Sequence, residues 1–101
     1  MSSTECVEKL KVLADSTRLA VMSELFLGPQ HVNNLARLLS VEQSLLSHHL
    51  RVLREAGLVV ANRVGKGVEY SLPASMTQLT KDNTINLGCC ALSFTTAGKK
   101  N

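Results

Sequence analysis

The chain has 101 residues, of which 45% are hydrophobic and 19% are charged, and it carries a formal net charge of +3. This length suits one domain with a modest core, and the composition excludes a disordered or fibrous chain. No apolar run approaches the ~20 residues that cross a bilayer, and residues 1–5 lack the pattern of a secretory signal. We therefore expect a cytoplasmic protein with no membrane partner.

Two short helices are predicted at the start of the chain. Residues 5–14 carry an amphipathic pattern, which indicates the first helix. Asp15 and Ser16 then supply the N-cap signal of a second helix. That helix is expected to stop at Gly28 and Pro29, because this pair cannot continue a helical backbone.

A third and a fourth helix follow, joined by a short turn. A one-sided apolar stripe predicts the third helix, and it consists of Val32, Leu35, Ala36 and Leu39. Ser40 is expected to open the fourth helix and to form a capping box with Gln43. The fourth helix should end at Gly57 and bury Leu46, Leu50 and Leu53. Two helices separated by so short a turn are typical of a helix-turn-helix.

After Gly57 the apolar period changes to two, which predicts a β-hairpin over residues 60–72. Glycines at both ends of a three-residue loop, residues 65–67, supply the positive φ that a tight turn needs. This loop would pair Val64 with Val68 and Arg63 with Glu69. The predicted fold class is mainly α with a β-hairpin wing, a winged helix-turn-helix over residues 1–72.

One face of the fourth helix is polar and lies opposite its leucines, and it consists of Gln43, Ser44, Ser47, His48 and Arg51. Small hydroxyls let the backbone come close to a major groove, and arginine and glutamine can contact base edges or phosphates. Arg63 and Lys66 make the neighbouring hairpin basic. The alternative is a polar face that only meets water, but its place between a tight turn and a basic hairpin favours DNA contact. His49 is instead expected to be half-buried and hydrogen-bonded.

The chain resembles the ArsR/SmtB family of bacterial repressors over about residues 5–72. The resemblance rests on the sequences DSTRL at 15–19, LA at 35–36, SLLSHHLRVLREAGLV at 44–59 and RVGKGVEY at 63–70. It implies a winged-helix homodimer that binds a palindromic operator in double-stranded DNA and represses genes until an inducer, often a metal ion or metalloid, weakens binding. It also implies that the recognition helix presents four of these residues, Ser44, Ser47, His48 and Arg51. Arg63 and Lys66 correspond to the wing.

The last part of the chain, residues 73–101, departs from the family pattern. It does not look like the long last helix that the family uses for dimerisation, and we expect a short strand or extended arm that assists the first helix in this role. The start of the third helix has no cysteine, and the tail has no histidine or glutamate. The resemblance therefore does not imply either of the usual zinc-sensing sites.

Three cysteines, Cys6, Cys89 and Cys90, are the candidate inducer ligands. Their odd number is unlike a secreted disulfide framework. Soft thiolates suit As(III), other trivalent metalloids or Cu(I), and Cys6 could approach the pair from the same or the partner subunit. A thiol redox switch and inert, buried cysteines are the alternatives. On a strand, Cys89 and Cys90 would point to opposite faces.

Two further classes of function compete with DNA binding. A winged helix can serve as a protein-interaction module without inducer sensing, and such a module would tolerate loss of the polar face of the fourth helix. A thiol oxidoreductase usually places Cys-x-x-Cys at a helix start, whereas this pair is adjacent. No phosphate-binding loop, catalytic carboxylate pair or nucleophile triad is evident in the sequence, so we expect a protein that is not an enzyme.

Overall fold

The first half of the chain is helical in the computed structural model, which describes residues 3–77 and 84–94. Four helices follow one another as predicted: α1 (Ser3–Leu13), α2 (Ser16–Phe26), α3 (Val32–Leu39) and α4 (Gln43–Glu55). Asp15 caps α2, because its side chain accepts a hydrogen bond of 2.9 Å from the backbone N–H of Arg18. Gly28, at φ 148°, lies just beyond the end of α2. These parts of the sequence prediction are confirmed.

The predicted capping box between Ser40 and Gln43 is wrong. Ser40 has φ 55° and ends α3, where its backbone N–H bonds to the carbonyls of Ala36 and Arg37. The N-cap of α4 is Glu42, which makes no side-chain capping bond. A left-handed residue is what closes a helix and reverses the chain. Ser40 therefore belongs to the end of α3, and α4 begins later than predicted, after a turn over residues 40–42.

The wing is a small antiparallel sheet of order β1-β3-β2, formed by β1 (Gln30–His31), β2 (Val60–Val64) and β3 (Gly67–Ser71). Val64 pairs with Gly67, and Arg63 pairs with Val68. The predicted three-residue loop and its register are therefore wrong by one position. Gly65, at φ 62°, takes the first of only two loop positions, where a type II′ turn needs glycine and matches the twist of the strands.

The tail folds back on itself instead of forming one strand or an extended arm. After the short helix α5 (Ala74–Thr77), strands β4 (Thr84–Asn86) and β5 (Ala91–Ser93) pair as an antiparallel hairpin. Cys89 and Cys90 lie in its turn, which a hydrogen bond of 2.8 Å from Leu87 N to Cys90 O closes. The expectation that the two cysteines occupy opposite faces of a strand is therefore wrong.

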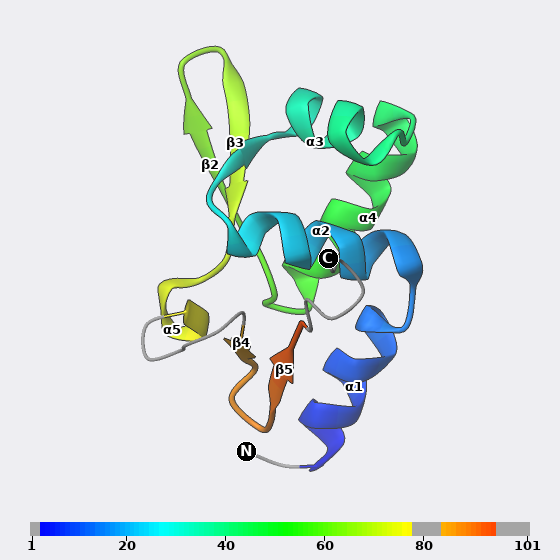
Figure 1. Cartoon of the computed structure of the whole chain (residues 1–101), viewed down its shortest axis with the longest axis vertical. Coiled ribbons are helices and arrows are strands. Elements are labelled where there is room, and N and C mark those ends of the chain that lie inside the picture. Colours follow the sequence, from blue (N-terminus) through cyan, green and yellow to red (C-terminus); the bar gives the residue numbers. More distant parts are fainter. Residues whose placement is uncertain (1–2, 78–83, 95–101) are drawn as a thin grey trace, which may run out of the picture.

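A single cluster of buried side chains joins the helices to this tail. Leu46, Leu50 and Leu53 of α4 have no exposed surface, as predicted, and the same cluster includes Met76, Ile85 and Leu87. Figure 1 shows the wing and α3 at one end of the molecule and α1 with the β4–β5 hairpin at the other. In the part of the chain that the structure describes, no helix combines the length and hydrophobicity needed to span a membrane. The architecture is a winged helix-turn-helix with an added C-terminal hairpin.

Candidate nucleic-acid interface and cysteine cluster

Helix α4 presents the predicted polar face to solvent. Its three leucines are buried, and all five predicted residues on the other side are exposed: Gln43, Ser44, Ser47, His48 and Arg51. This separation follows from the helical period, since residues three and four apart share a face. The arrangement leaves a ridge of two hydroxyls, an amide, an imidazole and a guanidinium standing off the body. We call these five residues the α4 ridge.

The wing lies beside the start of this ridge. Arg63 and Lys66 are both exposed. A cleft of about 620 Å³ separates the wing from the helix-turn-helix, and its lining includes Gln43, Lys66, His31 and Asn33. The structure thus brings Gln43 and Lys66 to one cleft, whereas the later ridge residues do not line it. The sequence did not point to His31, because the two-residue strand β1 is too short to leave a periodic signal. It did not point to Asn33 of α3 either, because only the folded wing brings this residue to the cleft.

Arg18 is a further residue whose role the sequence analysis missed, and it joins three helices. Its Nε donates to the carbonyl of Val12 in α1 at 2.7 Å, and its Nη1 lies 3.2 Å from His49 Nδ1 in α4. A guanidinium can only donate, so His49 Nδ1 is the acceptor in this contact. His49 is 12% exposed. The prediction of a half-buried, hydrogen-bonded histidine is confirmed, and Arg18 is the partner that orients α4.

The same junction holds a carboxylate. The hydrogen bond from the Arg18 backbone N–H lowers the pKa of Asp15, and the positive charge of Arg18 acts in the same direction. Both effects favour the ionised carboxylate. Asp15 is therefore charged near neutral pH, where it caps α2 and also helps to hold Arg18 against α1 and α4.

The three cysteines meet at the other end of the molecule, between α1 and the tail. Cys6 and Cys89 are joined by a disulfide with their Cα atoms 5.6 Å apart. Cys90 Sγ lies 3.6 Å from Cys6 Sγ and 3.7 Å from Cys89 Sγ, and all three residues are half-buried. The three cysteines of a single chain are thus close enough to form one cluster.

The surroundings of the cluster tie α1 to the tail turn. Lys9, one turn after Cys6, donates from Nζ to the carbonyl of Leu87 at 2.9 Å. Within residues 3–77 and 84–94, the cysteine cluster is the one place where three or more His, Cys, Asp or Glu side chains converge closely enough to share an ion. The donor set is therefore three sulfur atoms, which suits a soft, three-coordinate ion.

The sequence matches the model of a family described as bacterial regulatory protein, arsR family, over residues 15–60. It is also 42% identical over 71 residues to the HTH-type transcriptional regulator NmtR of Mycobacterium tuberculosis, covering 70% of this chain and 59% of NmtR. The chain spans between about half and six-tenths of the length of three of the curated relatives that it matches.

Two solved structures are similar over a larger share of their length. HlyU from Vibrio cholerae superposes with a TM-score of 0.70 at 33% identity, covering 75% of this chain and 83% of HlyU. The homodimeric winged helix-turn-helix DNA-binding domain of Mb0332 from Mycobacterium bovis has a TM-score of 0.69 at 26% identity, covering 75% of this chain and 71% of that domain. The aligned parts therefore share both sequence and fold.

Proposed function

Because the chain belongs to the arsR family of bacterial regulatory proteins, we propose that it is a DNA-binding transcriptional repressor, released from its operator by an inducer. The observation that carries the proposal is the exposed α4 ridge, which follows the helix-turn-helix turn and adjoins a basic wing. In this role the protein acts in the cytoplasm on double-stranded DNA and has no catalytic activity.

Each residue of the ridge has a contact that its chemistry suits. Ser44 and Ser47 are short, so α4 can enter the major groove closely, and their hydroxyls can bond to phosphates or base edges. Arg51 offers a fork that matches a guanine edge or a phosphate, and Gln43 suits an adenine edge. His48 extends the same surface, and the wing cations Arg63 and Lys66 contact the phosphate backbone beside it.

DNA recognition in this form requires a second copy of the chain. Two symmetry-related recognition helices read major grooves about 34 Å apart on a palindromic site, and one protomer supplies only one such helix. Helix α1 carries an exposed apolar pair, Val7 and Leu10, at 46% and 47% exposure. We propose that this face of α1, together with the tail hairpin, forms the homodimer interface. The homodimeric state of the Mb0332 domain supports this assignment.

A salt titration of operator binding tests the proposal. The reduced protein is mixed with a labelled duplex from its own promoter region, and anisotropy is followed as the salt concentration rises. Replacing Arg51 by Ala should weaken binding and reduce the log–log salt slope by about one unit if Arg51 contacts a phosphate. The matched control, Lys11→Ala, removes one positive charge from exposed α1. Once size-exclusion chromatography shows that this variant is still a dimer, it should leave the slope unchanged.

The variant Arg51→Lys distinguishes a phosphate contact of Arg51 from a contact with a base edge. Lysine keeps the charge but not the planar fork, so it should retain affinity for nonspecific duplex and lose about 1–3 kcal/mol of specific affinity if Arg51 reads a base. A protein-interaction module would respond to neither change. If wild type and Arg51→Ala show the same salt-independent affinity, the proposal is wrong.

A further inference from the structure

We propose that Cys6, Cys89 and Cys90 form a clamp between α1 and the tail hairpin. Two different chemical reactions can close this clamp. One input is a trivalent group-15 metalloid, arsenic or antimony, which uses all three sulfur atoms. The other is oxidation, which uses Cys6 and Cys89 alone. The inference rests on the proposed function for its effect on DNA, but not for the chemistry of the clamp.

The geometry of the sulfur atoms suits a shared ion. With metal–sulfur bonds of about 2.3 Å, thiolates on one ion lie roughly 3.4–3.8 Å apart. Cys90 Sγ already lies 3.6 Å and 3.7 Å from the other two sulfur atoms. Reduction of the disulfide by a thiol or a phosphine supplies two electrons and two protons and restores the thiols of Cys6 and Cys89. Separating these two sulfur atoms by a small distance then completes a triangle.

The metalloid reaction is a ligand exchange without a change of oxidation state. Arsenous acid, As(OH)₃, exchanges its three As–O bonds for three As–S bonds, and each thiol proton leaves with a hydroxide as water. Structural zinc sites, by contrast, take four protein ligands. Within the described part of the chain no fourth His, Cys, Asp or Glu joins the cluster. The three-sulfur donor set therefore favours a three-coordinate metalloid over Zn²⁺.

The oxidative reaction uses a peroxide as the two-electron acceptor. Cys6 and Cys89 give two protons and two electrons to hydrogen peroxide, a sulfur–sulfur bond forms, the O–O bond breaks, and two waters leave. The Cα atoms of Cys6 and Cys89 lie 5.6 Å apart, within the usual range for a disulfide. Both reactions thus join position 6 to position 89, and only the metalloid reaction also needs Cys90.

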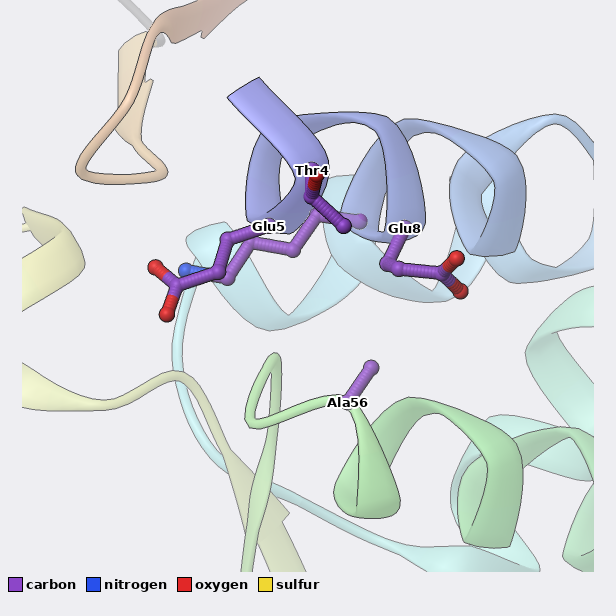
Figure 2. A pocket seen from close by; sticks show the side chains of 5 residues that line it. Thr4, Glu5, Glu8 and Ala56 are labelled. Carbon is purple, nitrogen blue, oxygen red and sulfur yellow. The ribbon is translucent and has the colours of Figure 1, made fainter. Parts of the chain in front are cut away.

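The clamp acts on the helix that lies next to the end of α4. Figure 2 shows Thr4, Glu5 and Glu8 of α1 on one side of a pocket and Ala56, just past α4, on the other. This open pocket of about 370 Å³ lies between α1 and the end of the recognition helix, so a shift of α1 against α4 would change its lining. A closed clamp ties α1 to the hairpin turn and restricts this shift. Each input then changes the affinity of the protein for its operator, because it favours one position of α1 over the other.

Binding is tested first without DNA. Protein reduced with a phosphine, which offers no competing thiol, is titrated with arsenite and examined by native mass spectrometry. We expect a mass gain of one arsenic less three hydrogens per chain and the loss of three titratable thiols. Because outer-shell partners alone change affinity about 10–100-fold, Cys90→Ser should weaken arsenite binding by about a hundredfold or more. An unchanged affinity in Cys90→Ser, or two chains per arsenic, overturns the clamp.

The response to each input is then measured on the operator complex. Arsenite and hydrogen peroxide should each weaken operator binding by wild-type protein, by about 5–150-fold, the usual range of allosteric coupling. Cys90→Ser should lose the response to arsenite and keep the response to peroxide, because it retains Cys6 and Cys89. Cys6→Ser should lose both responses. A far-UV spectrum of each reduced variant checks that it is folded.

The outcomes separate this inference from the proposed function. If the reduced wild type binds no operator but still takes up one arsenic through three thiols, the proposed function fails and the metalloid site stands. If the operator is bound but arsenite and peroxide change its affinity in opposite directions, or Cys90→Ser loses both responses, the single clamp is wrong. Cu(I) binding in place of arsenite, with no arsenic adduct, would also overturn the metalloid assignment.

Discussion

Arg18 and His49 lie 31 residues apart in the chain and are joined by a contact of 3.2 Å. The same arginine donates to Val12 O and is held by Asp15 through its backbone. A planar guanidinium can serve several acceptors at fixed angles, so one side chain sets how α1, α2 and α4 meet. The α4 ridge lies on the helix that this junction orients, which links a partly buried polar contact to the surface proposed to read DNA.

Replacing Asp15 tests this junction at the residue scale. Asp15→Ala should lower the free energy of unfolding by about 0.5–2 kcal/mol, because the N-cap of α2 is lost. Asp15→Asn keeps the capping oxygen and removes the charge. Urea denaturation of the three proteins at neutral and acidic pH measures both effects.

The pH dependence has a definite sign. The pKa of Asp15 is lower in the folded protein than in the unfolded chain, so its charge stabilises the fold above the unfolded value of about 3.9. This contribution is lost as the pH falls through the folded value. The stability difference between wild type and Asp15→Asn should therefore be present near neutral pH and vanish in acid. A difference that grows on acidification would contradict the role of the charge.

At the scale of single elements, periodicity was a good guide where elements are long and amphipathic. The four helices and the buried leucines of α4 followed directly from the spacing of apolar residues. The wing was predicted too, but glycines at 65 and 67 allow either a two- or a three-residue loop, and the register depends on that choice. Strand β1 and the tail hairpin could not be predicted, because two or three residues leave almost no period.

The convergence of the cysteines was beyond the reach of sequence patterns for another reason. Cys6 and Cys89 are separated by 83 residues, and local spacing says nothing about such a contact. Soft-ligand chemistry identified the three residues as one possible site, but only the packing of the tail against α1 brings them together. The α4 ridge needed no such contact, since all its residues belong to one helix.

A substitution at the wing tip tests the left-handed backbone conformation of Gly65. Gly65 has φ 62°, and a Cβ added there would meet no atom within 4 Å. Gly65→Ala should therefore cost about 1–2 kcal/mol through backbone conformation alone. Gly65→Asn should cost less, because asparagine tolerates the left-handed region. Denaturation curves of the two variants measure this order, and equal stability of all three proteins would argue against a strained position at residue 65.

At the scale of the whole molecule, the tail is part of the core although the DNA-reading elements precede it. Ile85 and Leu87 have almost no exposed surface and belong to the same cluster as the leucines of α4. The prediction of a separate arm over residues 73–101 underestimated this packing. Burial of the tail lets an event at Cys89 and Cys90 reach the body of the protein.

Truncating a core residue of the tail measures this integration. Ile85→Ala should destabilise the whole protein by about 2–5 kcal/mol in a single cooperative transition. Asn86→Ala, on an exposed neighbour in the same strand, is the matched control. It should cost only about 0.5–1.5 kcal/mol, because it removes the hydrogen bond from Gly88 N–H to Asn86 Oδ1 and no buried apolar side chain. A separate early transition for the tail, with the helices unaffected, would show that the tail folds independently.

The central claim is that the α4 ridges of two protomers bind the same DNA duplex. Hydroxyl-radical footprinting of the reduced protein on its own promoter region tests it most directly. The account predicts two protected patches centred one helical turn apart, about 10 base pairs, which disappear in Arg51→Ala at the same protein concentration. A promoter that stays uniformly cleaved at every concentration of the wild-type protein would contradict it.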